Sequence, residues 1–134
     1  MAVAASTQPG RIESRWITVG GLRIHARVSV NLPASACDVP VVLVHGLVVS
    51  SLYMLPTAER LATFFRVFAP DMPGFGKSDK PLRALDVPEL ADALVAWMDA
   101  AGLVQPVLVG NSLGCQVIAN VAARNPHRVA GVVL

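Results

Sequence analysis

Apolar and polar residues alternate near the start of the chain. Residues 22–30 place Leu, Ile, Ala and Val on one face and Arg, His and Ser on the other, and Gly20-Gly21 joins them to residues 16–19. Alternation with a period of two is typical of a half-buried strand, and a pair of glycines is typical of a tight hairpin turn. The pattern therefore predicts an antiparallel β-hairpin with one solvated face, on which His25 is exposed.

Later in the chain the apolar residues form short continuous runs, which are typical of strands covered on both faces in a parallel sheet. Segments with helical spacing separate these runs. The predicted strands are residues 41–44, 66–69, 107–109 and 129–134, and the predicted helices are residues 51–65, 86–102 and 113–124. Pro56 suits a first turn or a kink, and Asp86 with Glu89 predicts an N-terminal cap.

Strands and helices that alternate in this way predict an α/β fold. We expect a mostly parallel, twisted sheet with helices on both faces and the antiparallel hairpin at one edge. Residues 1–13 are expected to be a flexible lead, and residues 14–134 to form one unit that ends within a strand. The chain has 134 residues, whereas an α/β enzyme commonly has roughly 200 to 250. The unit is therefore expected to be the N-terminal part of a longer domain.

Composition excludes several classes of function. Eleven Lys and Arg residues oppose nine Asp and Glu residues and are scattered along the chain, which disfavours nucleic-acid binding. Cys37 and Cys115 have no CxxC spacing, so neither a zinc site nor a disulfide framework is indicated. Residues 1–10 lack the features of a signal peptide, and the most apolar window, residues 41–55, is too short to span a bilayer. We expect a soluble, cytoplasmic protein without a metal or cofactor.

One short motif carries nucleophilic chemistry. Gly110-Asn-Ser112-Leu113-Gly114 is a G-x-S-x-G sequence between a predicted strand and a predicted helix. A serine on such a sharp turn projects its hydroxyl above the sheet, and the two glycines leave room for the tight backbone. Ser112 is then a nucleophile, and the Leu113 amide can donate to an oxyanion. The alternative is a glycine-rich connection in which Ser112 only caps the helix.

A second segment agrees with the nucleophile interpretation. His45, Gly46 and Leu47 follow the first buried strand, and the Leu47 amide would supply a second oxyanion donor from the loop that leads into the first helix. His45 is expected to be structural and to form hydrogen bonds with neighbouring loops. His127 follows Asn-Pro at a helix end, where capping or plain exposure is expected.

The chain resembles the α/β-hydrolase superfamily over nearly its whole length. The resemblance is carried by the His45-Gly46 turn, the Asp-Met-Pro-Gly-Phe-Gly-Lys-Ser-Asp loop at 71–79, the turn at 110–114 and the Asn-Pro-His-Arg-Val segment at 125–129. It implies an incomplete α/β-hydrolase fold, Ser112 as nucleophile and oxyanion donors at Leu47 and Leu113. It also implies cofactor-free cleavage of a small-molecule ester, lactone, thioester or carbon–carbon bond. Branches with a carboxylate nucleophile, such as epoxide hydrolases and dehalogenases, do not fit Ser112.

The loop at 71–79 also invites a comparison with nucleotide-binding loops. Gly76-Lys77-Ser78 matches the end of a phosphate-binding loop, but Asp71 stands where its first glycine belongs and Pro81 prevents a helix from starting there. A dinucleotide-binding glycine pattern fails as well, because Asp79 takes the place of its last glycine. We expect this loop to border the active-site entrance.

The acid and base of a triad are missing from this chain. All nine carboxylates precede Ser112, and no histidine stands in the late position that the resemblance implies for a base. The chain is therefore expected to be inactive alone and to need a further C-terminal segment or to self-associate. Two alternatives remain open: a non-catalytic binding or interaction fragment that keeps the hydrolase scaffold, and an acyl transferase that uses the same serine.

Overall fold

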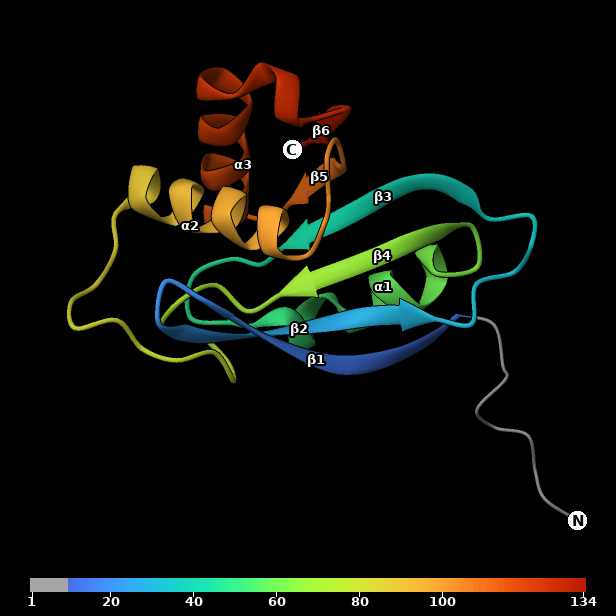
Figure 1. Cartoon of the computed structure of the whole chain (residues 1–134), viewed down its shortest axis with the longest axis horizontal. Coiled ribbons are helices and arrows are strands. Elements are labelled where there is room, and N and C mark those ends of the chain that lie inside the picture. The colour runs from blue at the N-terminus through green and yellow to red at the C-terminus, as the bar shows by residue number, and fades with distance from the viewer. Residues whose placement is uncertain (1–9) are drawn as a thin grey trace, which may run out of the picture.

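The computed structural model describes residues 10–134 and contains a six-stranded sheet with helices on both sides (Figure 1). The strands are β1 (Arg11–Val19), β2 (Leu22–Val30), β3 (Cys37–Val44), β4 (Phe65–Pro70), β5 (Val107–Gly110) and β6 (Gly131–Val133). The α-helices are α1 (Leu55–Leu61), α2 (Val87–Ala100) and α3 (Leu113–Arg124), and the short 3₁₀ helices are η2 (Ser51–Met54) and η3 (Pro126–Arg128).

The spatial order of the strands is β1-β2-β4-β3-β5-β6. β3, β4, β5 and β6 run parallel to one another, and β2 pairs antiparallel with both β1 and β4. From β3 the chain moves first to one neighbour, β4, and then crosses back to the other neighbour, β5. In open α/β sheets, the carboxyl ends of strands at such a reversal are the usual place for a binding site. The predicted fold class is confirmed. A binding site is therefore expected at the carboxyl ends of β3 and β5.

Alternate residues of β3 face the two sides of the sheet, and both sides are covered. Val42 and Val44 pack in a core with α2 and α3, whereas Val41 and Leu43 pack in a second core with α1. Figure 1 shows α2 and α3 together on one side of the sheet and α1 on the other. Burial of both faces is the reason why this strand is a continuous apolar run.

Helix α2 is the longest helix in the described part of the chain, with 14 residues. The cap predicted at Asp86 is confirmed, because its carboxylate accepts a hydrogen bond from the Glu89 amide at 2.9 Å. Pro56 lies in the first turn of α1, as predicted. Within residues 10–134, no helix combines the length and the hydropathy needed to cross a bilayer.

Several predicted boundaries differ from the structure, three of them by enough to matter. β1 begins at Arg11, so residues 11–13 belong to a strand rather than to a flexible lead, and residues 1–9 lie outside the described residues. These residues pair with the end of β2 up to Val30, a contact that their own mixed sequence does not reveal. β3 begins at Cys37 rather than at residue 41, and the helix predicted over residues 51–65 is split into η2 and the shorter α1.

The prediction that one face of the hairpin is solvated is wrong for two positions of β2, although Arg23 on the same face is exposed. His25 is completely buried and Ser29 is 9% exposed. β2 is an inner strand, because β4 pairs along its other edge, and the Asp71 amide donates a hydrogen bond to the His25 carbonyl at 2.8 Å. At His25 and Ser29 the alternation therefore separates two buried environments, one apolar and one polar, rather than core from solvent.

Candidate functional site

Ser112 lies in the turn between the end of β5 and the start of α3, called here the 110–114 turn. Its backbone has φ 55° and ψ −116°, a combination that a residue with a side chain rarely adopts. The residue is exposed, and its hydroxyl makes no capping hydrogen bond to α3. The interpretation of Ser112 as a simple helix cap therefore does not fit the structure.

The glycines of the 110–114 turn allow the backbone of α3 to approach that of β3. A Cβ atom on Gly114 would lie 2.8 Å from the carbonyl carbon of Val44 and 2.9 Å from the carbonyl oxygen of His45. A Cβ atom on Gly110 would lie 2.7 Å from the Cys115 nitrogen. These separations are too short for carbon atoms, so both positions require glycine, and the turn packs directly on the end of β3.

The loop after β3, residues 45–51, lies beside this turn. A Cβ atom on Gly46 would lie 3.2 Å from the Cβ atom of Ser112 and 3.2 Å from the Asn111 carbonyl oxygen. Leu47 follows Gly46, and Leu113 is the first residue of α3. Neither the Leu47 amide nor the Leu113 amide donates a hydrogen bond to another residue in the described range. Both donors are therefore available to a ligand near Ser112.

A cavity of about 600 Å³ adjoins this arrangement, and Leu47 and Leu113 both contribute to its wall. Its apolar lining includes Phe75, Leu85 and Leu90. The volume is within the range of sites that hold small organic molecules. A smaller cavity of about 310 Å³ between the hairpin and α2 includes neither Leu47 nor Leu113, so the first cavity is the candidate substrate site.

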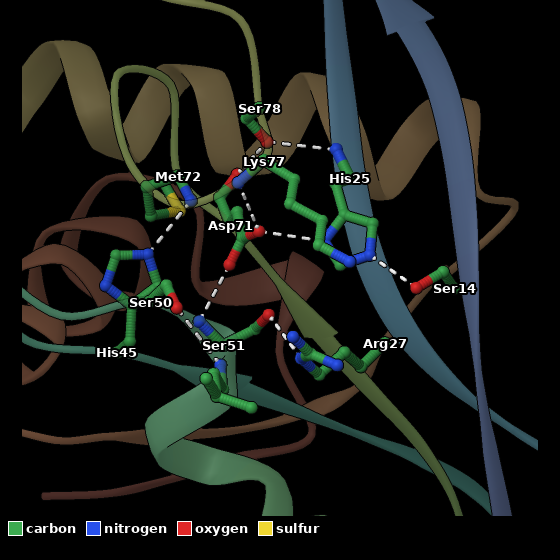
Figure 2. Close-up of polar contacts among 11 residues, drawn as sticks. Ser14, His25, Arg27, His45, Ser50, Ser51, Asp71, Met72, Lys77 and Ser78 are labelled. Carbon is green, nitrogen blue, oxygen red and sulfur yellow. Dashed lines mark hydrogen bonds and ion pairs between the residues drawn. The ribbon is translucent and has the colours of Figure 1, made fainter.

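His45 makes a hydrogen bond to a neighbouring loop, as the sequence predicts (Figure 2). Its Nε2 accepts a hydrogen bond from the Met72 amide at 3.0 Å, and its Nδ1 lies 2.8 Å from the Gly46 carbonyl oxygen. Because a backbone amide can only donate, Nε2 carries no proton and Nδ1–H donates to Gly46. Burial lowers the pKa of His45, in agreement with a neutral ring.

Asp71 is the centre of a buried polar cluster that the sequence analysis did not identify (Figure 2). Its Oδ1 accepts a hydrogen bond from the Ser51 amide at 2.7 Å. Its Oδ2 accepts one from the Lys77 amide at 2.9 Å and lies 2.8 Å from Nδ1 of His25. Burial alone would raise the pKa of Asp71, but the hydrogen bonds from Ser51, Lys77 and His25 outweigh it and hold the pKa below its ordinary value.

His25 links Asp71 to Ser14, whose hydroxyl lies 2.8 Å from Nε2 of the ring. Ser14, His25 and Asp71 thus follow the order of a catalytic triad. The His25 ring is completely buried, and the Trp16 ring lies against it at a centroid distance of 4.9 Å. A buried imidazole cannot deliver a proton to a leaving group, so we interpret this cluster as structural.

None of the three histidines offers a free base to Ser112. Both ring nitrogens of His25 and of His45 are already engaged in hydrogen bonds. His127 lies in η3, which follows α3 in the sequence, and it is exposed, one of the two roles expected for it. The two buried rings are therefore occupied, and the absence of a catalytic base among the three histidines stays a prediction.

The buried histidines predict a loss of stability in mild acid. Burial lowers the pKa of His25, with a partly opposing effect of Asp71, and burial also lowers that of His45. Below an ordinary pKa of 6.5 the unfolded chain therefore binds more protons than the folded chain. The free energy of unfolding should fall below pH 6.5, by up to about 1.4 kcal/mol per pH unit for each histidine. A further loss should follow below pH 3.8, where Asp71 is protonated in the unfolded chain.

Denaturant unfolding between pH 8 and pH 4 measures this dependence. His127→Gln serves as the matched control, because it removes an exposed histidine and leaves both buried rings in place. A free energy of unfolding that stays constant between pH 7 and pH 5 would contradict the role assigned to the two buried rings.

Similarity to known proteins agrees with this geometry. A family model described as the alpha/beta hydrolase fold matches residues 39–134. A 2-hydroxymuconate semialdehyde hydrolase from Pseudomonas sp. (strain CF600) is 36% identical over 121 residues, which cover 87% of this chain and 42% of the relative. A pimeloyl-[acyl-carrier protein] methyl ester esterase from Sodalis glossinidius is 36% identical over 96 residues, which cover 72% of this chain and 35% of the relative.

A solved structure extends the similarity to three dimensions. Cfl2 from Burkholderia cenocepacia superimposes with a TM-score of 0.82 at 29% sequence identity, and the match covers 90% of this chain and 40% of Cfl2. The chain thus spans less than half the length of each of these three proteins. Because the family model matches most of the sequence and the described fold agrees with it, the chain belongs to the α/β-hydrolase family.

Proposed function

We propose that this chain carries the nucleophile and the oxyanion donors of a serine hydrolase that acts on a small-molecule carbonyl compound. The Ser112 oxygen attacks the carbonyl carbon of an ester, lactone or thioester, and an acyl-enzyme forms as the leaving group departs. The amides of Leu47 and Leu113 hold the negative charge that develops on the carbonyl oxygen. Gly110 and Gly114 shape the turn that presents the hydroxyl.

The observation that carries this proposal is the strained backbone of Ser112. A residue with a side chain at φ 55° and ψ −116° costs of order 1–3 kcal/mol and persists only where the surroundings impose it. The strain leaves the hydroxyl exposed, without a hydrogen bond in the described structure, next to amides that are also unengaged. A structural serine would be expected to use its hydroxyl for the cap that is absent here.

The electrostatics of the turn support the same role. The Leu113 amide is at the N-terminus of the 12-residue helix α3, where the helix dipole favours negative charge. Leu47, on the neighbouring loop, supplies a donor from a second direction, and two converging donors are the arrangement that an oxyanion requires. The proton of Ser112 must be taken by a group other than His25 or His45, because both rings are fully engaged.

The cavity beside the turn favours a small organic substrate. It has a volume of about 600 Å³ and is lined in part by Leu47 and Leu113, the two residues whose amides are the proposed donors. Its lining is largely apolar, and Lys80 and Arg83 are its cationic members. The names of the two relatives, a hydrolase and an esterase, are consistent with this chemistry but belong to those proteins.

Labelling with a fluorophosphonate probe tests the proposal. Phosphonylation forms a bond between the serine oxygen and phosphorus with loss of fluoride, and the adduct imitates the tetrahedral intermediate. If a base other than His25 or His45 reaches Ser112, we expect a single adduct on the native protein, which peptide mass spectrometry should locate at Ser112. The same protein in denaturant, where the turn is lost, should not react. A folded sample without label would instead favour a non-catalytic binding domain that keeps the scaffold. The engagement of both buried histidines in hydrogen bonds is consistent with that alternative.

A further inference from the structure

We propose that Asp71 is a positioning residue that holds the loop carrying the Leu47 amide in the geometry needed to bind an oxyanion. The inference rests on the proposed function, because it gives the Leu47 amide a role in stabilising negative charge. Asp71 does not touch the substrate. It acts through the 45–51 loop, which the buried cluster around Asp71 connects to the carboxyl end of β4 (Figure 2).

Asp71 and Met72, which are consecutive in the sequence, hold the two ends of the 45–51 loop. At its start, the His45 ring accepts a hydrogen bond from the Met72 amide at 3.0 Å. At its end, the Ser51 amide donates to the Asp71 carboxylate at 2.7 Å. Ser51 is completely buried, and its hydroxyl accepts a hydrogen bond from Arg27 at 3.1 Å. A movement of Asp71 would therefore be transmitted directly to one anchor of the loop.

Between these anchors the loop has few interactions of its own. Leu47 and Val48 are 61% and 87% exposed. Val48 has φ 65°, a left-handed conformation that is unfavourable for a β-branched residue. Such strain persists only when the flanking structure fixes the backbone. The direction of the Leu47 amide is thus determined by the anchors rather than by packing of the Leu47 or Val48 side chain.

Asp71 is itself fixed from three sides. His25 and the Lys77 amide bind Oδ2, and the Ser78 hydroxyl donates to the Asp71 carbonyl oxygen at 2.6 Å. A Cβ atom on Gly76 would lie 2.7 Å from Oδ1 of Asp71, so the loop wraps closely around the carboxylate. The side chain is only 1% exposed. It therefore has no freedom to shift without breaking several hydrogen bonds at once.

The carboxylate is the chemical group that this position requires. Three N–H donors, from Ser51, Lys77 and His25, converge on its two oxygens. An asparagine has one acceptor oxygen, and its NH₂ group would face at least one of these donors. Asp71→Asn therefore preserves the shape of the side chain but breaks part of the anchor. We expect the Leu47 amide to sample other directions in this variant.

The test measures the rate of fluorophosphonate labelling together with amide hydrogen exchange of the peptide that contains residues 45–52. Asp71→Asn should slow labelling of Ser112 by about tenfold or more, since the loss of one oxyanion donor costs about 10² to 10³ in rate. Exchange in the loop peptide should become faster. In steady-state hydrolysis of an activated ester, kcat should fall while KM stays within about twofold, because the donor acts mainly on the transition state.

Ser29→Ala is the matched control. The Ser29 hydroxyl is also buried and accepts a hydrogen bond from the Val67 amide at 2.8 Å, but it is not in the anchor. This variant should lose stability without slowing the labelling. If Asp71→Asn does not fold, Arg27→Gln, which removes only the bond to the Ser51 hydroxyl, is measured in the same way and should slow labelling by about twofold to threefold.

Two outcomes would overturn the inference. One is an unchanged labelling rate in Asp71→Asn with unchanged exchange in the loop. The other is equal slowing in Asp71→Asn and Ser29→Ala, which would assign the effect to global stability. Failure of the proposed function looks different: the wild-type protein would not be labelled at Ser112 at all, while the exchange measurement would still report whether Asp71 holds the loop.

Discussion

Replacing Ser112 with alanine should abolish fluorophosphonate labelling and reduce the hydrolysis of activated esters by this protein to background. In a complete serine hydrolase, loss of the nucleophile lowers kcat by about 10⁶-fold. This fall applies where a base reaches Ser112. Without a base the protein retains only the rate that oxyanion donors and binding supply, and Ser112→Ala should leave that rate nearly unchanged. Initial rates with an activated aryl ester, corrected for spontaneous hydrolysis, measure the effect.

Two further variants separate the chemistry of Ser112 from the fold. Ser112→Gly also removes the hydroxyl, but glycine adopts φ 55° readily, so this variant should be at least as stable as the wild type and equally inactive. Thr63→Ala removes an exposed hydroxyl that binds only the Arg60 carbonyl oxygen, and its activity should be unchanged. Substantial ester hydrolysis in Ser112→Ala would mean that another group is the nucleophile.

The parts of the fold that the sequence predicts are those whose signal is local. β3 and β5 are continuous apolar runs because each is buried on both faces, and the cap of α2 needs only Asp86 and Glu89, three residues apart. The signal for the 110–114 turn is also local. Its glycines and its serine lie within five residues, so its place between a strand and a helix follows from sequence, although the role of Ser112 remains a prediction.

The buried polar cluster is not predictable in this way, because its contacts are distant in sequence. His25 and Asp71 are 46 residues apart, and the Asp71 carboxylate meets the Ser51 amide across 20 residues. In an alternating strand, a histidine on the polar face is ordinarily solvated, and only the pairing of β2 with β4 covers it. The sequence contains only a weaker signal for the role of Asp71. This residue directly follows the apolar end of β4, and polar side chains of parallel strands gather at such ends.

The start of β1 was missed for a related reason. Arg11, Glu13 and Arg15 give the strand a charged sequence that resembles a flexible lead, and they form ion pairs with one another along the strand. What makes the segment a strand is its register with β2, which pairs every residue from Arg11 to Val19. Pairing with a strongly patterned neighbour can thus override a weak local preference.

The 110–114 turn also predicts a large effect of Gly114→Ala on stability. A Cβ atom at this position would lie within 3 Å of the backbone of both Val44 and His45. These are backbone atoms at the end of an inner strand, so they cannot rotate away, and α3 must shift away from β3. We expect a loss of about 3 kcal/mol or more, measured by denaturant unfolding. Labelling at Ser112 should fall with it, because the same shift moves the Leu113 amide away from the Leu47 amide.

Gly131→Ala provides the comparison that isolates close packing from the general effect of replacing glycine. Gly131 begins β6, and a Cβ atom there would meet nothing within 4 Å. Its substitution should change the free energy of unfolding by less than about 0.5 kcal/mol. If Gly114→Ala were as well tolerated as Gly131→Ala, the close approach of α3 to β3 would be wrong. The described packing of the 110–114 turn on the loop after β3 would then be wrong. The proposal of two oxyanion donors at Leu47 and Leu113 would lose its structural basis.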